Sequence, residues 1–297
     1  MAISEQRAIA ERKDTRHPVL RAVLWMSGTL ASFMAMAIGG RELSAELGTF
    51  EILFFRSLLG LGVIALLLGR RGWRQLRTRR FRLHLLRNTA HFAGQFGWFY
   101  GIAFLPLAEV FAIEFTVPVW TALLAATFLA ERLGTARYAA VGLGVAGTLV
   151  ILQPGVAALH PAAAAVLLSA VAYAISHTVT KRLSGIDTPL AILFYMTAIQ
   201  LPLGLVPALA HWVTPSAAMW PWLVVVGLTA LTAHYCMVRA LALADVTVVV
   251  PMDFLRLPLI ALVGLIFYGE HLAWPVLAGA TLILAGNFIN IRAERRT

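Results

Sequence analysis

The sequence has few charged residues and a single cysteine. Of its 297 residues, 13% are charged and 60% are hydrophobic, whereas a soluble domain has about 25% charged and about 45–50% apolar residues. So few charges could not cover the surface of two water-soluble domains, and so apolar a chain is not disordered. Cys236 alone supports neither a disulfide framework nor a cysteine-rich metal site. The composition therefore indicates a polytopic membrane protein.

The sequence also lacks the motifs of the common hydrolytic enzymes. It contains no GxxxxGK[ST], no GxSxG and no HExxH, so a P-loop, a nucleophile elbow and a zinc-protease helix are excluded. His91, His177 and His234 do not have the spacing of metal ligands. We therefore expect no enzyme activity, no metal and no cofactor.

Apolar segments recur along the chain, each about long enough to cross ~30 Å of hydrocarbon at 1.5 Å per residue. They predict an all-α protein with ten transmembrane helices, at 18–39, 49–69, 85–105, 107–129, 136–153, 161–181, 188–210, 219–243, 245–269 and 273–291. Residues 1–17 and 292–297 are polar and form the two tails. The first tail lacks the apolar region and cleavage site of a secretory signal.

The basic residues predict the orientation of these helices. If the N-terminus is cytoplasmic, 21 of the 24 Lys and Arg residues fall at the cytoplasmic side, and the opposite loops contain Arg41 alone. This asymmetry predicts that both termini lie in the cytoplasm. The excess of Arg over Lys indicates a GC-rich bacterial genome, so we expect the protein in a bacterial inner membrane. The run RRGWRQLRTRRFR at 70–82 is expected to contact lipid headgroups rather than nucleic acid.

Short sequence matches at a nearly constant offset indicate an internal repeat. Leu-Ser at 43–44 recurs at 183–184, Ile-Leu-Phe at 52–54 recurs at 192–194, LPLAEV at 105–110 matches LALADV at 241–246, and Glu-Phe at 114–115 matches Asp-Phe at 253–254. The repeats are 18–153 and 161–291, with five helices each. Because five is odd, the second repeat is inverted in the membrane, which is typical of transporters. A local match at offset 143 would pair His91 with His234, but we favour Trp98 as the counterpart of His234.

The chain resembles the ten-helix drug/metabolite transporter superfamily. The resemblance rests on the two five-helix repeats, on LPLAEV before the fourth helix, and on Glu-Arg at 131–132 and Glu-His at 270–271 after the fourth and ninth helices. The run ALADV…P…LR…P…GE at 242–270 is similar to the amino-acid and metabolite exporters of that superfamily. The resemblance implies a basket of helices around a central cavity.

Four charged residues lie well inside the predicted helices: Arg56, Glu114, Asp253 and Arg256. Each would cost about 2.5–3.5 kcal/mol if it faced lipid, so we expect them to face inward as ion pairs. Asp253 and Arg256 are three residues apart on one helix face and can pair, which leaves Arg56 for Glu114. These pairs either hold helices together or hold a substrate.

Polar and aromatic residues also recur at helical spacing. They predict a partly apolar cavity lined by Asn88, His91, Gln95 and Trp98 on the third helix, Tyr173 and His177 on the sixth, Tyr235 on the eighth and Trp25 on the first. The alternative is hydrogen bonding between helices, which membrane bundles use widely.

Pro118, Pro251 and Pro258 interrupt the fourth and ninth helices and predict either gating points or static kinks.

Together these features predict a secondary transporter that exports amino acids or related small amphipathic metabolites by alternating access. One alternative is an exchanger of nucleotide sugars or phosphorylated metabolites, which should need several unpaired Lys or Arg residues in the cavity. Another is an intramembrane enzyme, for which no set of catalytic groups is evident. The expected partners are the small-molecule substrate and the lipid bilayer, without nucleic acid, and no feature requires an oligomer.

Overall fold

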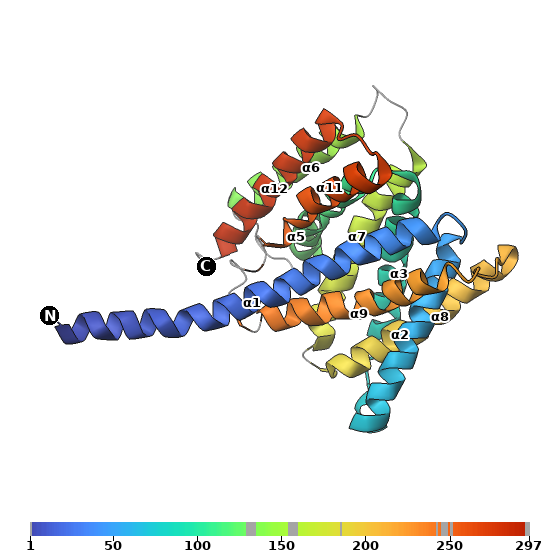
Figure 1. Cartoon of the computed structure of the whole chain (residues 1–297), viewed down its shortest axis with the longest axis horizontal. Helices are drawn as coiled ribbons and strands as arrows, with labels where there is room; N and C mark the ends of the chain where they lie inside the picture. The colour runs from blue at the N-terminus through green and yellow to red at the C-terminus, as the bar shows by residue number, and fades with distance from the viewer. Residues whose placement is uncertain are drawn as a thin grey trace.

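The computed structural model describes residues 2–128, 135–153, 160–184, 186–241, 243–244, 249 and 252–294. The regular structure in these ranges is helical (Figure 1), which confirms the predicted fold class. The helices are α1 (Ala2–Leu43), α2 (Thr49–Arg71), α3 (Phe81–Phe104), α4 (Leu107–Glu114), α5 (Val117–Phe128), α6 (Thr135–Leu152), α7 (Pro161–Ser184), α8 (Pro189–Ala208), α9 (Trp220–Leu241), α11 (Arg256–Tyr268) and α12 (Trp274–Glu294), with 3-10 turns η1 (Trp73–Leu76) and η2 (Leu209–His211).

The helices pack in pairs that join the two halves of the chain. Figure 1 shows α1 alongside α9, and the most extensive contacts also pair α3 with α7, α2 with α8 and α6 with α12. In terms of the ten predicted helices, the first packs on the eighth and the third on the sixth. In two repeats of five helices, the first helix corresponds to the sixth and the third to the eighth. The first–eighth pair and the third–sixth pair are therefore equivalent, as two related repeats require.

The first helix is longer than the sequence analysis predicted. We expected it at 18–39 after a polar tail, but α1 runs from Ala2 to Leu43. The tail is rich in Ala, Glu, Lys and Arg, which favour helix. The helix therefore begins within the tail and runs on into the transmembrane segment.

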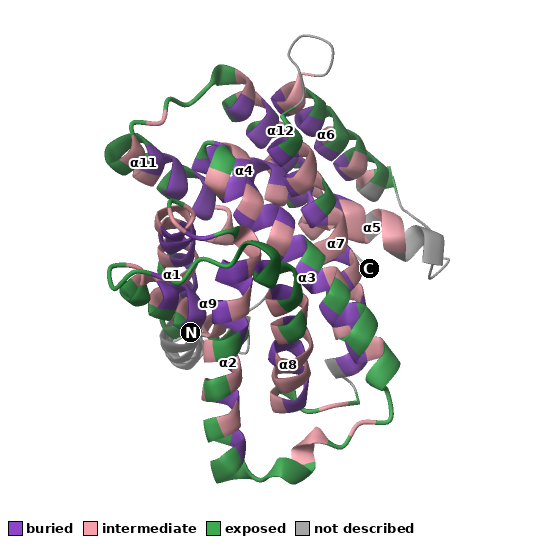
Figure 2. Ribbon diagram, turned by 90° about the vertical axis from the view of Figure 1, so that its right-hand side faces the viewer, coloured by how far each residue is buried: buried purple, intermediate pink, exposed green. Residues whose placement is uncertain are grey.

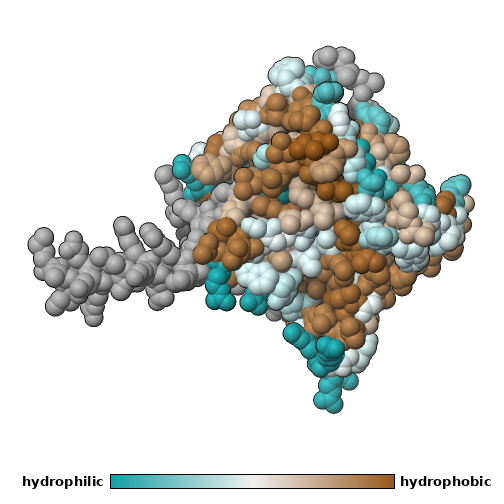
Figure 3. Space-filling model, in the orientation of Figure 1, coloured by the Kyte–Doolittle hydropathy of each residue, from teal (hydrophilic) through white to brown (hydrophobic). Residues whose placement is uncertain are grey.

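The outer surface of the bundle is apolar. Within the described residues, five helices are long and apolar enough to cross a membrane, at Leu20–Leu43, Thr49–Arg71, Pro161–Leu183, Pro189–His211 and Trp220–Ala240. Large apolar side chains such as Leu66, Val206 and Phe267 are more than 60% exposed, and hydrophobic atoms cover much of the face in Figure 3. Exposed apolar surface on this scale indicates contact with lipid. Helix α3 is also long enough to cross a membrane, but its buried polar residues lower its mean hydropathy.

The predicted fourth and ninth helices are each broken near the middle. Helix α4 ends at Glu114, a turn follows at 115–116, and α5 begins at Val117; likewise 252–253 are helical, 254–255 form a turn, and α11 begins at Arg256. The prediction of continuous helices at 107–129 and 245–269 is therefore wrong. The two breaks are 139 residues apart, which matches the offset of the repeat.

Two of the three predicted helix-interrupting prolines start new helices. Pro118 and Pro258 are the second residue of α5 and the third of α11, where the missing N–H would have no partner in the helix. They therefore follow the breaks and do not kink a continuous helix. Pro251 lies outside the described residues. The Phe115 carbonyl, freed at the first break, accepts a hydrogen bond from Asn287 Nδ2 at 2.9 Å, which satisfies a backbone group that lipid could not.

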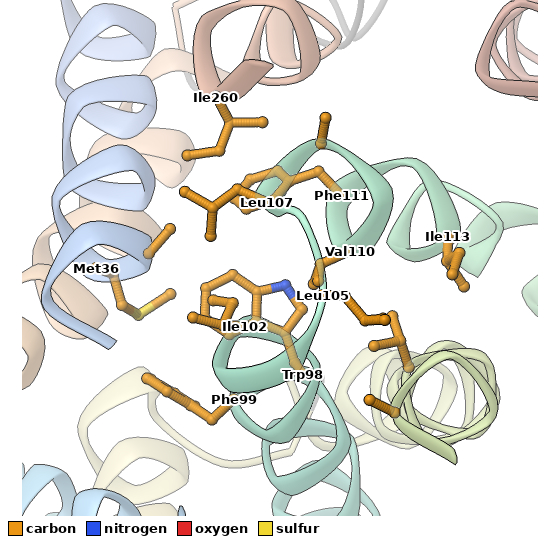
Figure 4. Close-up of a cluster of buried hydrophobic side chains, with 14 of the residues drawn as sticks. Met36, Trp98, Phe99, Ile102, Leu105, Leu107, Val110, Phe111, Ile113 and Ile260 are labelled. Carbon is orange, nitrogen blue, oxygen red and sulfur yellow. The ribbon is translucent and has the colours of Figure 1, made fainter. Parts of the chain in front are cut away.

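The main hydrophobic core surrounds α4, where the first and second halves meet. Figure 4 shows Trp98, Phe99 and Ile102 of α3 packed with residues of α4, Met36 of α1 and Ile260 of α11. Buried residues gather on the facing sides of these helices in Figure 2. This core holds both broken helices against the centre of the bundle.

Helices α6 and α12 approach each other closely at two glycines. A Cβ atom at Gly147 would lie 2.5 Å from the Gly279 carbonyl oxygen. We expect Gly147→Ala to lower the stability by about 1–3 kcal/mol because the helices must separate. Gly142→Ala in the same helix is the control, since no atom of the described residues lies within 4 Å of its Cβ position and alanine favours helix. Thermal unfolding of both purified variants tests this, and equal midpoints would contradict the close packing.

The orientation predicted from the basic residues can be tested by labelling. Replacing Cys236 with serine removes the single thiol, and cysteines can then be placed at Ala45 or Gln75. The positive-inside rule predicts that a membrane-impermeant thiol reagent labels position 45 from outside the cell and position 75 only after the membrane is opened. Labelling of both positions from the same side would refute the topology.

Candidate functional site

A cavity of about 300 Å³ lies between the two halves, beside both helix breaks. This volume is at the lower end of the about 300–1,000 Å³ typical of small-molecule sites. The lining residues come from α1, α2, α3, α7, α9 and the two broken helices: Phe33, Met36, Arg56, His91, Gln95, Trp98, Phe99, Glu114, Phe115, Val117, Pro118, Tyr173, His177, His234, Met237, Asp253, Phe254 and Arg256. The cavity therefore combines charged, polar and aromatic groups.

Arg256 is the buried centre of a partly buried charge cluster at the helix breaks. Its Nη1 lies 3.2 Å from Glu114 Oε1 and its Nη2 lies 2.6 Å from Asp253 Oδ2. Trp98 Nε1 donates to the other oxygen of Glu114 at 2.8 Å. The guanidinium also lies over the Phe33 ring, 4.6 Å from its centroid. One cation thus joins acids from both repeats.

This cluster corrects one of the two predicted ion pairs. Arg256 pairs with Asp253 as the spacing suggested, but Glu114 pairs with Arg256 and not with Arg56. The reason is the pair of helix breaks, since Arg256 opens α11 just after the second break and Glu114 closes α4 just before the first. Continuous helices would not have suggested this contact.

Arg56 is left as a buried cation in the cavity wall. Its side chain extends from α2, and the residue is only 6% exposed. Its Nε is inaccessible and has no hydrogen-bond partner among the residues that the structure describes. In the part of the chain that the structure describes, Arg56 makes no ion pair.

The stripe on α3 faces the cavity over much of its predicted length. His91, Gln95 and Trp98 line it, and Gln200 Nε2 lies 3.0 Å from His91 Nδ1. On α7, the Tyr173 ring lies edge-on to His91, 5.6 Å away, and is stacked with His177 at 6.2 Å. The two helices thus present a joined polar and aromatic wall.

Three residues expected in the cavity lie elsewhere. Asn88 is fully buried and accepts a hydrogen bond from Arg87 Nη1 at 2.7 Å. Its side chain therefore contacts Arg87, about one helical turn before His91, and does not line the cavity. Trp25 and Tyr235 pack edge-to-face at 5.7 Å, and Tyr235 is 56% exposed. On α9 the cavity is lined by His234 instead, and adjacent residues of a helix point about 100° apart. The predicted stripe on this helix is therefore out of phase by one residue.

His234 lines the cavity but was not among the residues predicted to do so. Thr-Ala-His at 89–91 recurs at 232–234, and His91 and Trp98, the two candidate counterparts of His234, both line the cavity as well. Phe33, Met36 and Phe254 also line the cavity but were not predicted, because an apolar residue in an apolar helix cannot be told from its neighbours by sequence pattern.

Within the described ranges, no three His, Cys, Asp or Glu residues lie close enough to hold a metal ion.

Polar contacts tie the halves together at both ends of the bundle. Near the connection from α3 to α4, Arg41 Nη2 lies 2.9 Å from Glu270 Oε1, and the Leu107 backbone N–H donates to Glu270 Oε2 at 2.8 Å. Near the start of α3, His84 Nε2 lies 2.8 Å from Asp187 Oδ2. Each contact joins a residue of the first half to one of the second.

This two-part arrangement has a clear counterpart among known families. The profile of the EamA-like transporter family matches residues 20–153 and again residues 160–292. The chain belongs to this family. It is a small-molecule transporter of the drug/metabolite transporter superfamily and an integral membrane protein, as the resemblance in the sequence implied.

Relatives in this family are named for transport in both directions. The chain is 25% identical over 283 residues to an S-adenosylmethionine uptake transporter of Rickettsia felis, covering 95% of this chain and 96% of the relative. It is 34% identical over 230 residues to a riboflavin transporter of Rhizobium johnstonii, covering 77% and 76%. It is 29% identical over 259 residues to a pseudopaline exporter of Pseudomonas aeruginosa, covering 86% and 91%.

A solved crystal structure has the same fold. It superposes with a TM-score of 0.63 at 18% sequence identity, over 93% of this chain and 98% of the other. At this identity the likeness concerns the arrangement of helices alone.

Proposed function

We propose that the protein is a secondary transporter of amino acids or related small amphipathic metabolites, and that these solutes cross through the central cavity by alternating access. The observation that carries this proposal is the cavity itself, which lies between the two halves at both helix breaks. Broken helices at the interface of related repeats are where transporters commonly bind their solutes.

The chemistry of the wall suits an amphipathic solute. Phe33, Phe99 and Phe115 provide apolar contact, while His91 and Gln95 provide hydrogen-bonding groups. Buried Gln95 Oε1 has no hydrogen-bond partner among the described residues, and a solute donor can satisfy it. A purely apolar solute would leave these groups unpaired.

The contacts at the two ends of the bundle support alternating access. Arg41–Glu270 and His84–Asp187 each link the first half to the second, at opposite ends of α3. If the halves rock against each other, one link breaks while the other stays formed, and the cavity opens to one side at a time.

The charges in the wall make a phosphorylated solute less suitable. A doubly charged phosphate group favours several free Lys or Arg residues. Of the two arginines among the described lining residues, Arg256 pairs with two acids and only Arg56 lacks an acid partner.

Export is the direction that the sequence favours and remains part of the proposal, although relatives include an uptake transporter.

Exchange in proteoliposomes tests this function without assuming a direction. Vesicles with the purified protein are loaded with an unlabelled solute and then given the same solute in radiolabelled form. The panel contains each amino acid, S-adenosylmethionine and riboflavin, and protein-free vesicles are the control. We expect label to accumulate for at least one amino-acid-type solute. Accumulation of riboflavin alone, or of nothing in the panel, would contradict the proposed substrate class.

A further inference from the structure

We propose that Arg56 is the binding site for the carboxylate of the transported solute, and that the solute is a zwitterion. The inference rests on the proposed function and assigns a substrate group to one side chain. It starts from the burial of Arg56, which lies in the cavity wall with no acid beside it in the described structure.

A buried guanidinium without a counter-ion is expensive to maintain. Removing a charge from water is repaid only when an opposite charge and hydrogen bonds replace the water. Arg256 in the same cavity has its opposite charges in Glu114 and Asp253, whereas Arg56 has no ion pair among the described residues. The Nε atoms of both arginines are buried without a hydrogen-bond partner there, so the difference between the two arginines is the missing counter-ion of Arg56. The missing partner of Arg56 is therefore an anion that enters the cavity.

The neighbours of Arg56 do not provide that anion. Tyr173, His91, His177 and His234 share the cavity wall, and each of these side chains is neutral or positive near neutral pH. A guanidinium matches the planar geometry of a carboxylate with two parallel hydrogen bonds. Arg56 thus presents an open site for such a group.

The opposite charge is offered elsewhere in the cavity. Within the described ranges, Glu114 and Asp253 share one cation, Arg256, and Asp253 Oδ1 has no hydrogen-bond partner. This cluster therefore has one negative charge in excess when both acids are ionised, and it can attract an ammonium group.

The net charge of the cavity lining indicates which net charge of the solute the cavity favours. The described lining residues include two Arg residues and two acids, so the formal charge of this part of the lining is zero. A zwitterion would complete both partial sites and leave this balance unchanged, whereas a phosphorylated solute would add uncompensated negative charge. The cavity therefore favours a solute with a carboxylate and a cation on an apolar body.

Matched amino acids and amides test the assignment of Arg56. The thermal midpoint of the purified protein is measured with L-phenylalanine, L-methionine and L-leucine, each compared with its carboxamide, and with inorganic phosphate. The proteins are the wild type, Arg56→Gln, Arg56→Lys and Arg87→Gln, the last being a buried arginine outside the cavity lining. Binding is read directly, so the result does not depend on transport.

We expect at least one amino acid to stabilise the wild type and Arg87→Gln more than its amide does. In Arg56→Gln this preference should vanish, with affinity for the carboxylate reduced about tenfold or more, and Arg56→Lys should recover part of it. Without solute, Arg56→Gln should melt at a higher temperature than the wild type.

Three results would overturn the assignment. These are an unchanged preference in Arg56→Gln, no preference for any carboxylate in the wild type, or stabilisation by phosphate alone. A normal carboxylate preference together with no exchange in vesicles would instead reject transport of these solutes and leave the Arg56 site standing.

Discussion

Arg256→Gln is expected to lower the free energy of unfolding by about 3–5 kcal/mol, the usual effect of removing one partner from a buried charge pair. The change would leave Glu114 and Asp253 in the interior with no cation between them. It would also remove the contact between α4 and the start of α11, so both broken helices lose a support. The thermal midpoint and yield of the purified variant measure the loss.

Neutralising the two acids provides the decisive control. Because the damage comes from uncompensated charge, the triple variant with Arg256→Gln, Glu114→Gln and Asp253→Asn should be more stable than Arg256→Gln alone. Arg239→Gln, an exposed residue on α9, should have little effect. A single Arg256→Gln variant as stable as the wild type would show that the cluster does not hold the helices together.

His91→Ala is expected to reduce transport about tenfold or more while stability falls much less. His91 lines the cavity, is 4% exposed, and is fixed by Gln200 through one ring nitrogen. The other nitrogen can bond to a solute, and losing a buried hydrogen bond of this kind reduces an equilibrium constant about tenfold. Exchange per folded molecule in proteoliposomes gives the transport effect, and thermal unfolding gives the stability effect.

Asn88→Ala is the matched control for His91→Ala. Asn88 is buried on the same helix, three residues earlier, but it does not line the cavity. It should lose stability and keep its transport activity per folded molecule. If both variants lose stability alone, His91 is a structural histidine and the cavity wall has been assigned the wrong role.

Much of the fold follows from patterns that are local in the sequence. The number of apolar segments and the constant repeat offset need only hydropathy and arithmetic, and they led to the all-helical, two-repeat architecture. The stripe on α3 could also be placed, because polar residues at helical spacing in a membrane helix must face inward. His91, Gln95 and Trp98 accordingly lie in the cavity wall.

The features that were missed depend on three-dimensional contacts. The break at 115–116 precedes Pro118, so the proline alone suggested a kink at the wrong residue. The partner of Glu114 is Arg256, 142 residues away in the sequence, and this contact forms only because both helices are broken. On α9, Tyr235 and His234 are both chemically suitable, and only packing against α1 decides which of them faces the cavity.

Alternating access requires this cavity to open to each side of the membrane in turn. A single cysteine at Met237, which lines the cavity, tests it in the Cys236→Ser background. A membrane-impermeant thiol reagent is applied to right-side-out and to inside-out vesicles, with and without a transported solute. We expect labelling from both sides, reduced by the solute in each case. Labelling from one side only, with no protection by the solute, would contradict it.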